Sequence, residues 1–212
     1  MDAAPTVTPA APQPPRRWRR WLLPSVAVSI VLLSASCSIF TGPRDLSRYP
    51  ARVTSPYKLP WPAGVKWLCI QSNRGIVSHR GSGEFAFDFM MPEGSDVCAA
   101  RAGVVTAIVV SHDGHGLKAP NNYIAIGHGD GTSGWYLHLR KDGSLVRVGE
   151  RVEQGQRIAH SGHVGRSLAP HLHFQVRDDA RRTTIPISFA DVTEHAGVPR
   201  MGFSYTSGNK VQ

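Results

Sequence analysis

Two histidines, His171 and His173, stand two positions apart within the apolar run of residues 170–176. Side chains at positions i and i+2 of a β-strand point to the same side, so both imidazoles are expected to project from one face, with Leu172 on the other. Imidazoles are frequent zinc ligands and frequent general bases near neutral pH. The motif therefore predicts a metal site or a site of proton transfer, with a histidine pair on a solvated face as the alternative.

Three further polar residues lie beside apolar runs upstream of this pair. His138 lies in residues 135–139, Asp88 stands among the aromatic residues 85–91, and His79 precedes that segment. A carboxylate among aromatic side chains must be paired, hydrogen-bonded or bound to a metal, because an isolated buried charge is too costly. Asp88 alone would be explained by a turn cap or an arginine partner. The whole set favours a catalytic zinc site, which keeps three protein ligands and one open position.

Short strands are the elements expected to position these side chains. Runs of β-branched and aromatic residues alternate with Gly, Asp, Asn and Pro after residue 65, and no convincing helix is expected after residue 41. The expected strands are residues 65–70, 85–89, 104–110, 123–126, 135–139, 145–148 and 171–176. The pattern predicts an antiparallel all-β domain, sandwich-like or barrel-like, over residues 65–190, followed by a loose polar tail at 191–212.

Taken in order, these motifs resemble the lysostaphin-type (LytM-like) zinc metallopeptidases, which cut peptide bonds in bacterial peptidoglycan. The resemblance covers residues 79–176. It is carried by His79, Asp88, Pro92, Glu93, Gly94, Val97, Ala99, Gly103, Tyr136, His138, Val148, Gly149, Val152, Gln154, Gly155, Gln156, Ser161, Gly162, Gly165, Ser167, Pro170, His171, Leu172, His173 and Phe174. The family implies a β-sandwich or barrel-like metallopeptidase domain of the duplicated hybrid motif type.

The resemblance also implies roles for five residues and Zn2+ as the cofactor. It implies His79, Asp88 and His173 as zinc ligands, and His138 and His171 as unliganded catalytic histidines. One departure concerns spacing: eight residues separate His79 from Asp88, whereas the compact family motif has three. Glu84 lies in this interval and is the alternative ligand.

The expected activity is zinc-dependent hydrolysis of peptide bonds in cell-wall stem peptides or cross-links. One of the two unliganded histidines would take the proton of the attacking water and the other would stabilise the oxyanion, in an order that the sequence leaves open. The alternative is a non-catalytic module of the same fold that binds the wall and activates another wall hydrolase. The complete set of five side chains argues against this alternative. A biotinyl-type carrier is excluded because the hairpin turn at residues 153–156 holds no lysine.

The N-terminal region predicts export to the cell envelope. Residues 1–20 are rich in proline, end in four arginines and are expected to be disordered, and residues 21–40 are uncharged. Such a run, with arginines on one side, predicts either an uncleaved membrane anchor with a cytoplasmic N-terminus or a cleaved signal peptide, including a lipoprotein signal ending at Cys37. Residues 41–64 are expected to form a Pro-rich linker. All readings place the remainder outside the cytoplasm, in the periplasm or cell envelope.

Charge indicates the kind of partner. The chain has a net charge of +9, and the part after residue 37 keeps +6, because residues 1–37 hold four Arg and one Asp. An anionic envelope polymer such as peptidoglycan or a bacterial membrane surface fits this charge. Nucleic acid is disfavoured, since no basic cluster with interleaved aromatic residues follows residue 41. A regulatory protein partner is left open by the sequence, as is the oligomeric state.

Three cysteines are too few for a disulfide scaffold or a four-cysteine zinc site. Cys69 and Cys98 belong to the exported part and lie in or near expected strands. A disulfide between them is the favoured expectation in an oxidising compartment, and two buried free thiols are the alternative.

Overall fold

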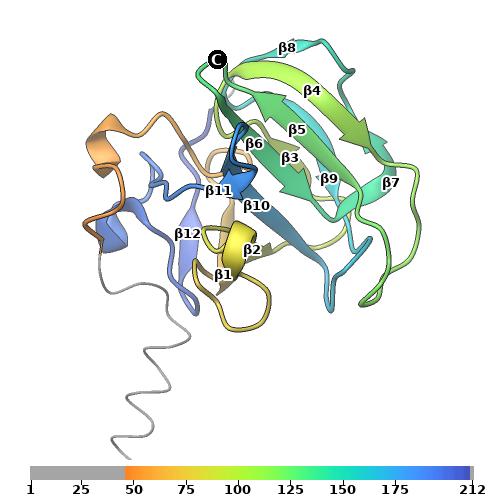
Figure 1. Cartoon of the computed structure of the whole chain (residues 1–212), viewed down its shortest axis with the longest axis horizontal. Coiled ribbons are helices and arrows are strands. Elements are labelled where there is room, and N and C mark those ends of the chain that lie inside the picture. The colour runs from red at the N-terminus through yellow and green to blue at the C-terminus, as the bar shows by residue number, and fades with distance from the viewer. Residues whose placement is uncertain (1–45, 211–212) are drawn as a thin grey trace, which may run out of the picture. The chain divides into compact units, whose positions relative to one another are not determined.

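The computed structural model describes residues 46–210, in which nearly all regular structure is β (Figure 1). The strands are β1 Lys66–Gln71, β2 Phe87–Met90, β3 Asp96–Cys98, β4 Gly103–Val109, β5 Tyr123–Gly127, β6 Thr132–Leu137, β7 Leu139–Ser144, β8 Arg151–Val152, β9 Arg157–Ser161, β10 His171–Asp178, β11 Thr183–Thr184 and β12 Ser204–Thr206. The helical elements of this region are the short 3₁₀ turns η1 Arg52–Thr54, η2 Gly81–Gly83 and η3 Glu194–Gly197. The predicted antiparallel all-β fold is confirmed.

Two antiparallel sheets make up this domain. The larger sheet has the strand order β12-β1-β2-β10-β6-β5-β4-β8, with β11 paired to β10, and the smaller has the order β3-β9-β7. Strand β10 lies in the middle of the larger sheet, between β2 and β6. A central strand is held on both edges, so the side chains that it carries have well-fixed positions.

The alternation of β10 separates a core face from a polar face. Leu172, Phe174 and Val176 are fully buried in the hydrophobic core, which also takes side chains from the smaller sheet. His171 and His173 alternate with them and therefore point to the opposite face, as the spacing predicted. The polar face of the larger sheet is where the candidate site lies.

Segments outside the predicted domain limits also pack into the core. Tyr57, Leu59 and Trp61 are buried, and the Trp61 ring meets the Phe89 ring edge-on at 4.8 Å. The later part of the expected linker is thus a structural part of the domain. Large aromatic and aliphatic side chains explain this, because each buries apolar surface that a free linker would expose.

The expectation of a loose C-terminal tail is wrong. Strand β12 pairs with β1, and its Tyr205 is buried. The Asn209 side-chain amide, also buried, donates hydrogen bonds to the carbonyls of Leu59 (3.0 Å) and Ala99 (3.1 Å). These backbone and side-chain hydrogen bonds fix a segment whose composition had indicated only a polar loop.

Two local expectations also differ from the structure. The predicted strand at residues 145–148 is irregular and links β7 to β8. His138 was expected inside a strand, but β6 ends at Leu137 and β7 begins at Leu139, and His138 between them has a φ of +63°. This left-handed conformation is uncommon for a non-glycine residue and turns the His138 side chain out of the regular alternation.

The expected disulfide is also wrong. Cys69 lies on β1 in the larger sheet and Cys98 on β3 in the smaller one, and both are buried free thiols. Burial raises the pKa of both thiols, that of Cys98 to about 12. They therefore act as small apolar side chains of the core.

The predicted membrane or signal segment, residues 21–40 with Cys37, lies outside the described residues, as does the basic segment 1–20. Among residues 46–210, no helix has the length and apolar character needed to cross a membrane. Export and anchoring therefore stay predictions.

Candidate metal centre

Strand register brings Asp88 and His173 together. The two residues face each other across the β2–β10 pair, and His171 faces Met90 two residue pairs along. Asp88 Oδ1 lies 2.8 Å from His173 Nδ1 and 3.7 Å from His171 Nε2. The sheet thus fixes one carboxylate against two imidazoles that are contributed by a strand 83 and 85 residues later in the chain.

His79 joins this pair from the long connection between β1 and β2. Its Nε2 atom lies 3.2 Å from Asp88 Oδ2, and its ring meets the His173 ring edge-on at 5.1 Å. One possible ligand atom from each of His79, Asp88 and His173 lies within 4.8 Å of the other two. The alternative ligand, Glu84, instead forms ion pairs with Arg48 (3.8 Å) and Arg74 (3.7 Å).

The hydrogen bonds on the far sides of the two rings fit a metal site. His79 Nδ1–H donates to the Ser72 carbonyl (2.9 Å), and His173 Nε2–H donates to Gln175 Oε1 (3.2 Å). In this tautomer His79 presents the lone pair of Nε2 to the Asp88 carboxylate at 3.2 Å, and this Nε2 is a buried atom without a hydrogen-bond partner. A lone pair that faces a carboxylate is repelled unless a cation lies between them, so this donor set fits a metal ion.

Gln71 orients the carboxylate of Asp88. Its Oε1 accepts hydrogen bonds from the backbone N–H groups of Val77 and Ser78, both at 3.2 Å. Its Nε2 must therefore face the other way, where it donates to Asp88 Oδ2 (2.7 Å) and to Ser78 Oγ (2.8 Å). One side chain thus ties the carboxylate to the loop that carries His79. Gln71 and Gln175 were missed by the sequence reasoning, since no local pattern marks either residue.

Opposing effects set the charge of the Asp88–His173 pair. Burial disfavours a charged Asp88, but His79 and His173 outweigh burial, so the pKa of Asp88 lies well below its usual range. Burial likewise disfavours a charged His173, but Asp88 outweighs it and raises the pKa of His173. Asp88 is therefore ionised at neutral pH and available as an anionic ligand.

His138 and His171 lie beside this cluster, with ring centroids 4.6 Å apart. His138 Nδ1–H donates to the Val164 carbonyl (2.9 Å), and His171 Nδ1–H donates to the Ala169 carbonyl (2.7 Å). In each neutral ring the Nε2 atom is therefore the unprotonated nitrogen. Burial lowers the pKa of both rings, that of His138 to about 3, where the neighbouring His171 and His173 add to the effect. Both are neutral at pH 7 and able to accept a proton.

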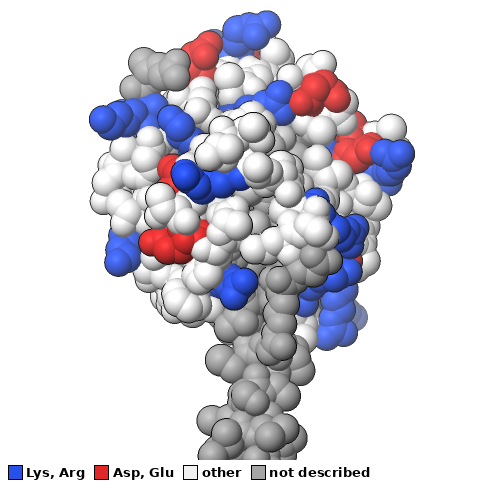
Figure 2. Space-filling model, turned by 90° about the vertical axis from the view of Figure 1, so that its left-hand side faces the viewer, with Lys and Arg blue, Asp and Glu red and all other residues white. Residues whose placement is uncertain are grey.

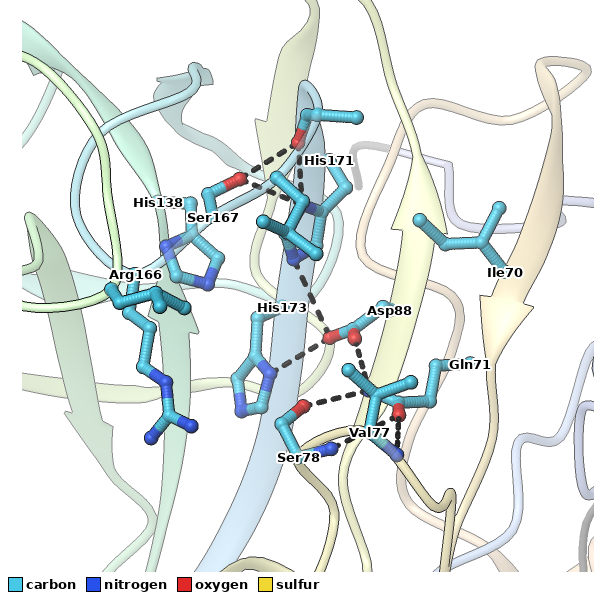
Figure 3. Close-up of a pocket in the computed structure, with 13 residues that line it drawn as sticks. Ile70, Gln71, Val77, Ser78, Asp88, His138, Arg166, Ser167, His171 and His173 are labelled. Carbon is cyan, nitrogen blue, oxygen red and sulfur yellow. Dashed lines mark hydrogen bonds and ion pairs between the residues drawn. The ribbon is translucent and has the colours of Figure 1, made fainter.

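Four of these five residues line one open pocket of about 210 Å³ (Figure 3), whereas the buried His79 does not. Its polar wall includes Asp88, His138, His171 and His173. The hydroxyl Oγ of Ser167 lies 3.1 Å from His171 Nδ1. The structure thus gathers all five residues that the sequence singled out. An antiparallel β protein with a His–Asp–His metal site and two neutral histidines in the same pocket is the class that this fold and site define.

Comparison with known proteins agrees with this class. The sequence profile of peptidase family M23 matches residues 82–185, so this domain of the chain is similar to that family. Asp88, His138, His171 and His173 fall within the matched stretch, whereas His79 lies three residues before it. The predicted family resemblance is confirmed.

Individual relatives match the same region. The chain is 36% identical over 126 residues to the peptidoglycan DD-endopeptidase ShyA of Vibrio cholerae, covering 55% of this chain and 26% of the relative. It is 40% identical over 96 residues to the glycyl-glycine endopeptidase ALE-1 of Staphylococcus capitis, covering 45% and 25%. A solved structure of the catalytic domain of lysostaphin from Staphylococcus simulans is 30% identical, with a TM-score of 0.41, covering 61% of this chain and 84% of that one. The chain spans about a quarter of the length of the curated relatives named here.

Proposed function

We propose that this chain is a zinc-dependent peptidoglycan endopeptidase, which hydrolyses peptide bonds in cell-wall stem peptides or cross-links. The observation that carries the proposal is the convergence of His79, Asp88 and His173 beside two neutral histidines in one open pocket. Similarity to peptidase family M23 and the names of the relatives, which are endopeptidases of peptidoglycan or of glycyl-glycine bonds, support it.

Zinc is the metal that we propose for this site. Two imidazole nitrogens and one carboxylate oxygen are a usual ligand set for catalytic zinc, and the pocket leaves the site open to a water molecule. When bound, zinc would lower the pKa of water towards about 7 and polarise the scissile carbonyl group. The backbone carbonyl of Ser72 and the side-chain carbonyl of Gln175 would hold the two ligand rings in the required tautomers.

His138 and His171 would move the proton. Each holds its Nδ1–H on a backbone carbonyl, so the unprotonated Nε2 atom is the one that can accept a proton from the attacking water. The ring that becomes protonated can then donate from Nε2 to the leaving amine. The other ring stays close enough, at 4.6 Å between ring centroids, to act on the same reacting group.

Peptidoglycan is the proposed substrate for two reasons: the names of the similar proteins and the net positive charge of this chain. The net charge of +6 on the part after residue 37 favours approach to an anionic polymer. Figure 2 shows basic and acidic side chains interspersed over one face, so no single basic patch defines the partner there. Electrostatic attraction would then act at long range, and the pocket itself would select the bond.

Location in the cell envelope is part of the same proposal. The uncharged residues 21–40 behind four arginines support export, either with an anchor or with cleavage, including lipid attachment at Cys37. Cell fractionation of the full chain and of a Cys37→Ser variant tests this. Recovery of the full chain in the cytoplasm would contradict export, and an unchanged membrane fraction of the variant would exclude lipid attachment as the anchor.

The second candidate, a non-catalytic module that activates another wall hydrolase, is less well supported. Such a module has no need of an intact ligand set, whereas this chain brings three possible ligands and two further histidines together. Bound metal together with release of wall fragments by the purified chain would exclude it.

The decisive experiment measures bound zinc and the release of muropeptides from purified peptidoglycan by the full chain. We expect about one zinc per chain and soluble fragments whose masses identify the bond that is cut. His160→Ala serves as a matched control, since His160 lies outside the pocket on β9. Zinc binding without any fragment release would overturn the endopeptidase proposal, and absence of zinc after loading would overturn the ligand assignment.

A further inference from the structure

One cationic side chain, Arg166, lines the metal pocket on the side of His138, across from Gln71 and Val77 (Figure 3). Its side chain is exposed, and no ion pair joins its guanidinium to any carboxylate within residues 46–210. Asp88 is the one carboxylate in the pocket wall, and His79, His173 and Gln71 already engage it. The pocket thus contains an unpaired positive charge next to a site built for a metal cation.

The backbone that carries Arg166 is held firmly on both sides. The Arg166 N–H donates to Asn121 Oδ1 (2.8 Å), and Gly165 packs so closely on Asn121 that a Cβ there would lie 2.0 Å from the same oxygen. On the other side Ser167 is buried, and its Oγ donates to the Ala169 carbonyl (2.7 Å) beside His171. A long side chain that starts from so fixed a point keeps its guanidinium within reach of the pocket mouth.

Three aliphatic side chains surround the same opening. Val77, Leu117 and Leu168 line the pocket, and each of these residues is 68–79% exposed to solvent. Exposed aliphatic side chains gathered at one opening mark a contact surface for a ligand. A ligand that covers them removes water from around the guanidinium, which strengthens any ion pair formed there.

We propose that Arg166 binds a free carboxylate of the substrate beside the scissile bond, so that the pocket prefers acidic stem peptides to uncharged peptide bridges. This inference rests on the proposed endopeptidase function. A guanidinium matches a carboxylate through two parallel charge-assisted hydrogen bonds, while the aliphatic residues contact the peptide around it. An uncharged peptide bridge offers Arg166 no such partner. One partly exposed ion pair of this kind should make binding of the acidic peptide about tenfold tighter.

The test uses two synthetic cross-linked stem peptides that differ in one group, a free carboxylate or its carboxamide next to the scissile bond. For the full chain loaded with zinc, we expect kcat/KM to be about tenfold higher for the carboxylate peptide. Arg166→Gln should bring the ratio of the two kcat/KM values close to one, and Arg166→Lys should restore part of it. Arg151→Gln, which changes an exposed arginine on β8 outside the pocket, is the matched control and should keep the preference.

A binding measurement decides the question independently of turnover. In a His171→Ala background, calorimetry should give a dissociation constant about tenfold lower for the carboxylate peptide, and the added Arg166→Gln change should remove this difference. Equal affinities for the two peptides, or no binding of either, would overturn the role of Arg166. Equal cleavage of both peptides by the unmodified chain would do the same and would leave the endopeptidase function standing. If the zinc-loaded chain cuts neither peptide nor peptidoglycan, the proposed function fails, and the affinity ratio still decides whether Arg166 reads a carboxylate.

Discussion

The metal cluster is assembled from two unlike regions: the β2–β10 strand pair and the connection between β1 and β2, residues 72–86. In the strand pair, four consecutive residue pairs are in register, and this register places Asp88 opposite His173. In the connection, a single backbone carbonyl, that of Ser72, holds the ring of His79. The β2–β10 pair fixes the positions of Asp88 and His173 by repeated backbone hydrogen bonds. The connection instead holds His79 in place by a few particular contacts.

The side chain of Gln71 compensates for this difference. It lies at the end of β1, accepts the N–H groups of Val77 and Ser78, and donates to Asp88. The connection wraps so tightly around it that a Cβ on Gly75 would lie 2.4 Å from Gln71 Cγ. An irregular segment can thus present a ligand as firmly as a strand does when a buried amide satisfies its backbone.

The largest effect should come from breaking the strand half of the cluster. His173→Ala removes a proposed ligand that the sheet holds against Asp88, leaving a buried carboxylate with fewer partners. We expect loss of bound metal and a fall in activity of about three orders of magnitude, or about 4 kcal/mol. Elemental analysis and muropeptide release measure the two effects. Retention of one metal ion per chain would show that His173 is no ligand.

A somewhat smaller effect should follow from removing either unliganded histidine. His138→Ala and His171→Ala should lower activity about 10²-fold, because each removes a neutral ring with a free Nε2 atom from the pocket. Metal content should stay unchanged in both variants. Loss of metal from either variant would show that the substituted histidine is itself a metal ligand and not only a proton-transfer group.

The comparison between strand and connection is sharpened by Gln71→Leu. This change keeps a buried side chain of similar size but removes the hydrogen bonds to Asp88 and to the loop that carries His79. We expect the metal affinity to fall about 10–100-fold, as for other residues that orient metal ligands. Competition with a chelator measures the affinity. An unchanged affinity would mean that the connection holds His79 without Gln71.

The smallest effect is expected for Glu84→Gln in the same connection. Glu84 pairs with Arg48 and Arg74 at 3.8 and 3.7 Å, and its side chain is partly exposed. Partly exposed ion pairs contribute less than about 1 kcal/mol, so thermal unfolding should shift little and metal affinity should not change. A large loss of bound metal would instead make Glu84, not His79, the third ligand.

Much of the site could be predicted because its signals are local. The spacing of His171 and His173 placed both rings on one face, and the aromatic neighbours of Asp88 required a partner for its charge. The succession of short strands gave the fold class. These inferences hold because the two-residue period of a strand and the cost of an isolated buried charge act in any tertiary context.

Other features needed the folded chain. The sequence could not show that β12 pairs with β1, that Cys69 and Cys98 lie in different sheets, or that His138 adopts a left-handed conformation between two strands. Each depends on which segments meet, and such pairings join residues far apart in the chain. Composition and spacing carry no information about them.

The sequence by itself determined which residue types could serve as metal ligands and which strand carries two of the five key residues. Only the tertiary structure decided that His79 rather than Glu84 faces Asp88, that Gln71 and Gln175 support the cluster, and that Arg166 stands unpaired at the pocket mouth. The physical reason is the difference between local and long-range order. Alternation along a strand follows from backbone geometry, whereas the approach of separate segments follows from packing and sheet register over the whole domain.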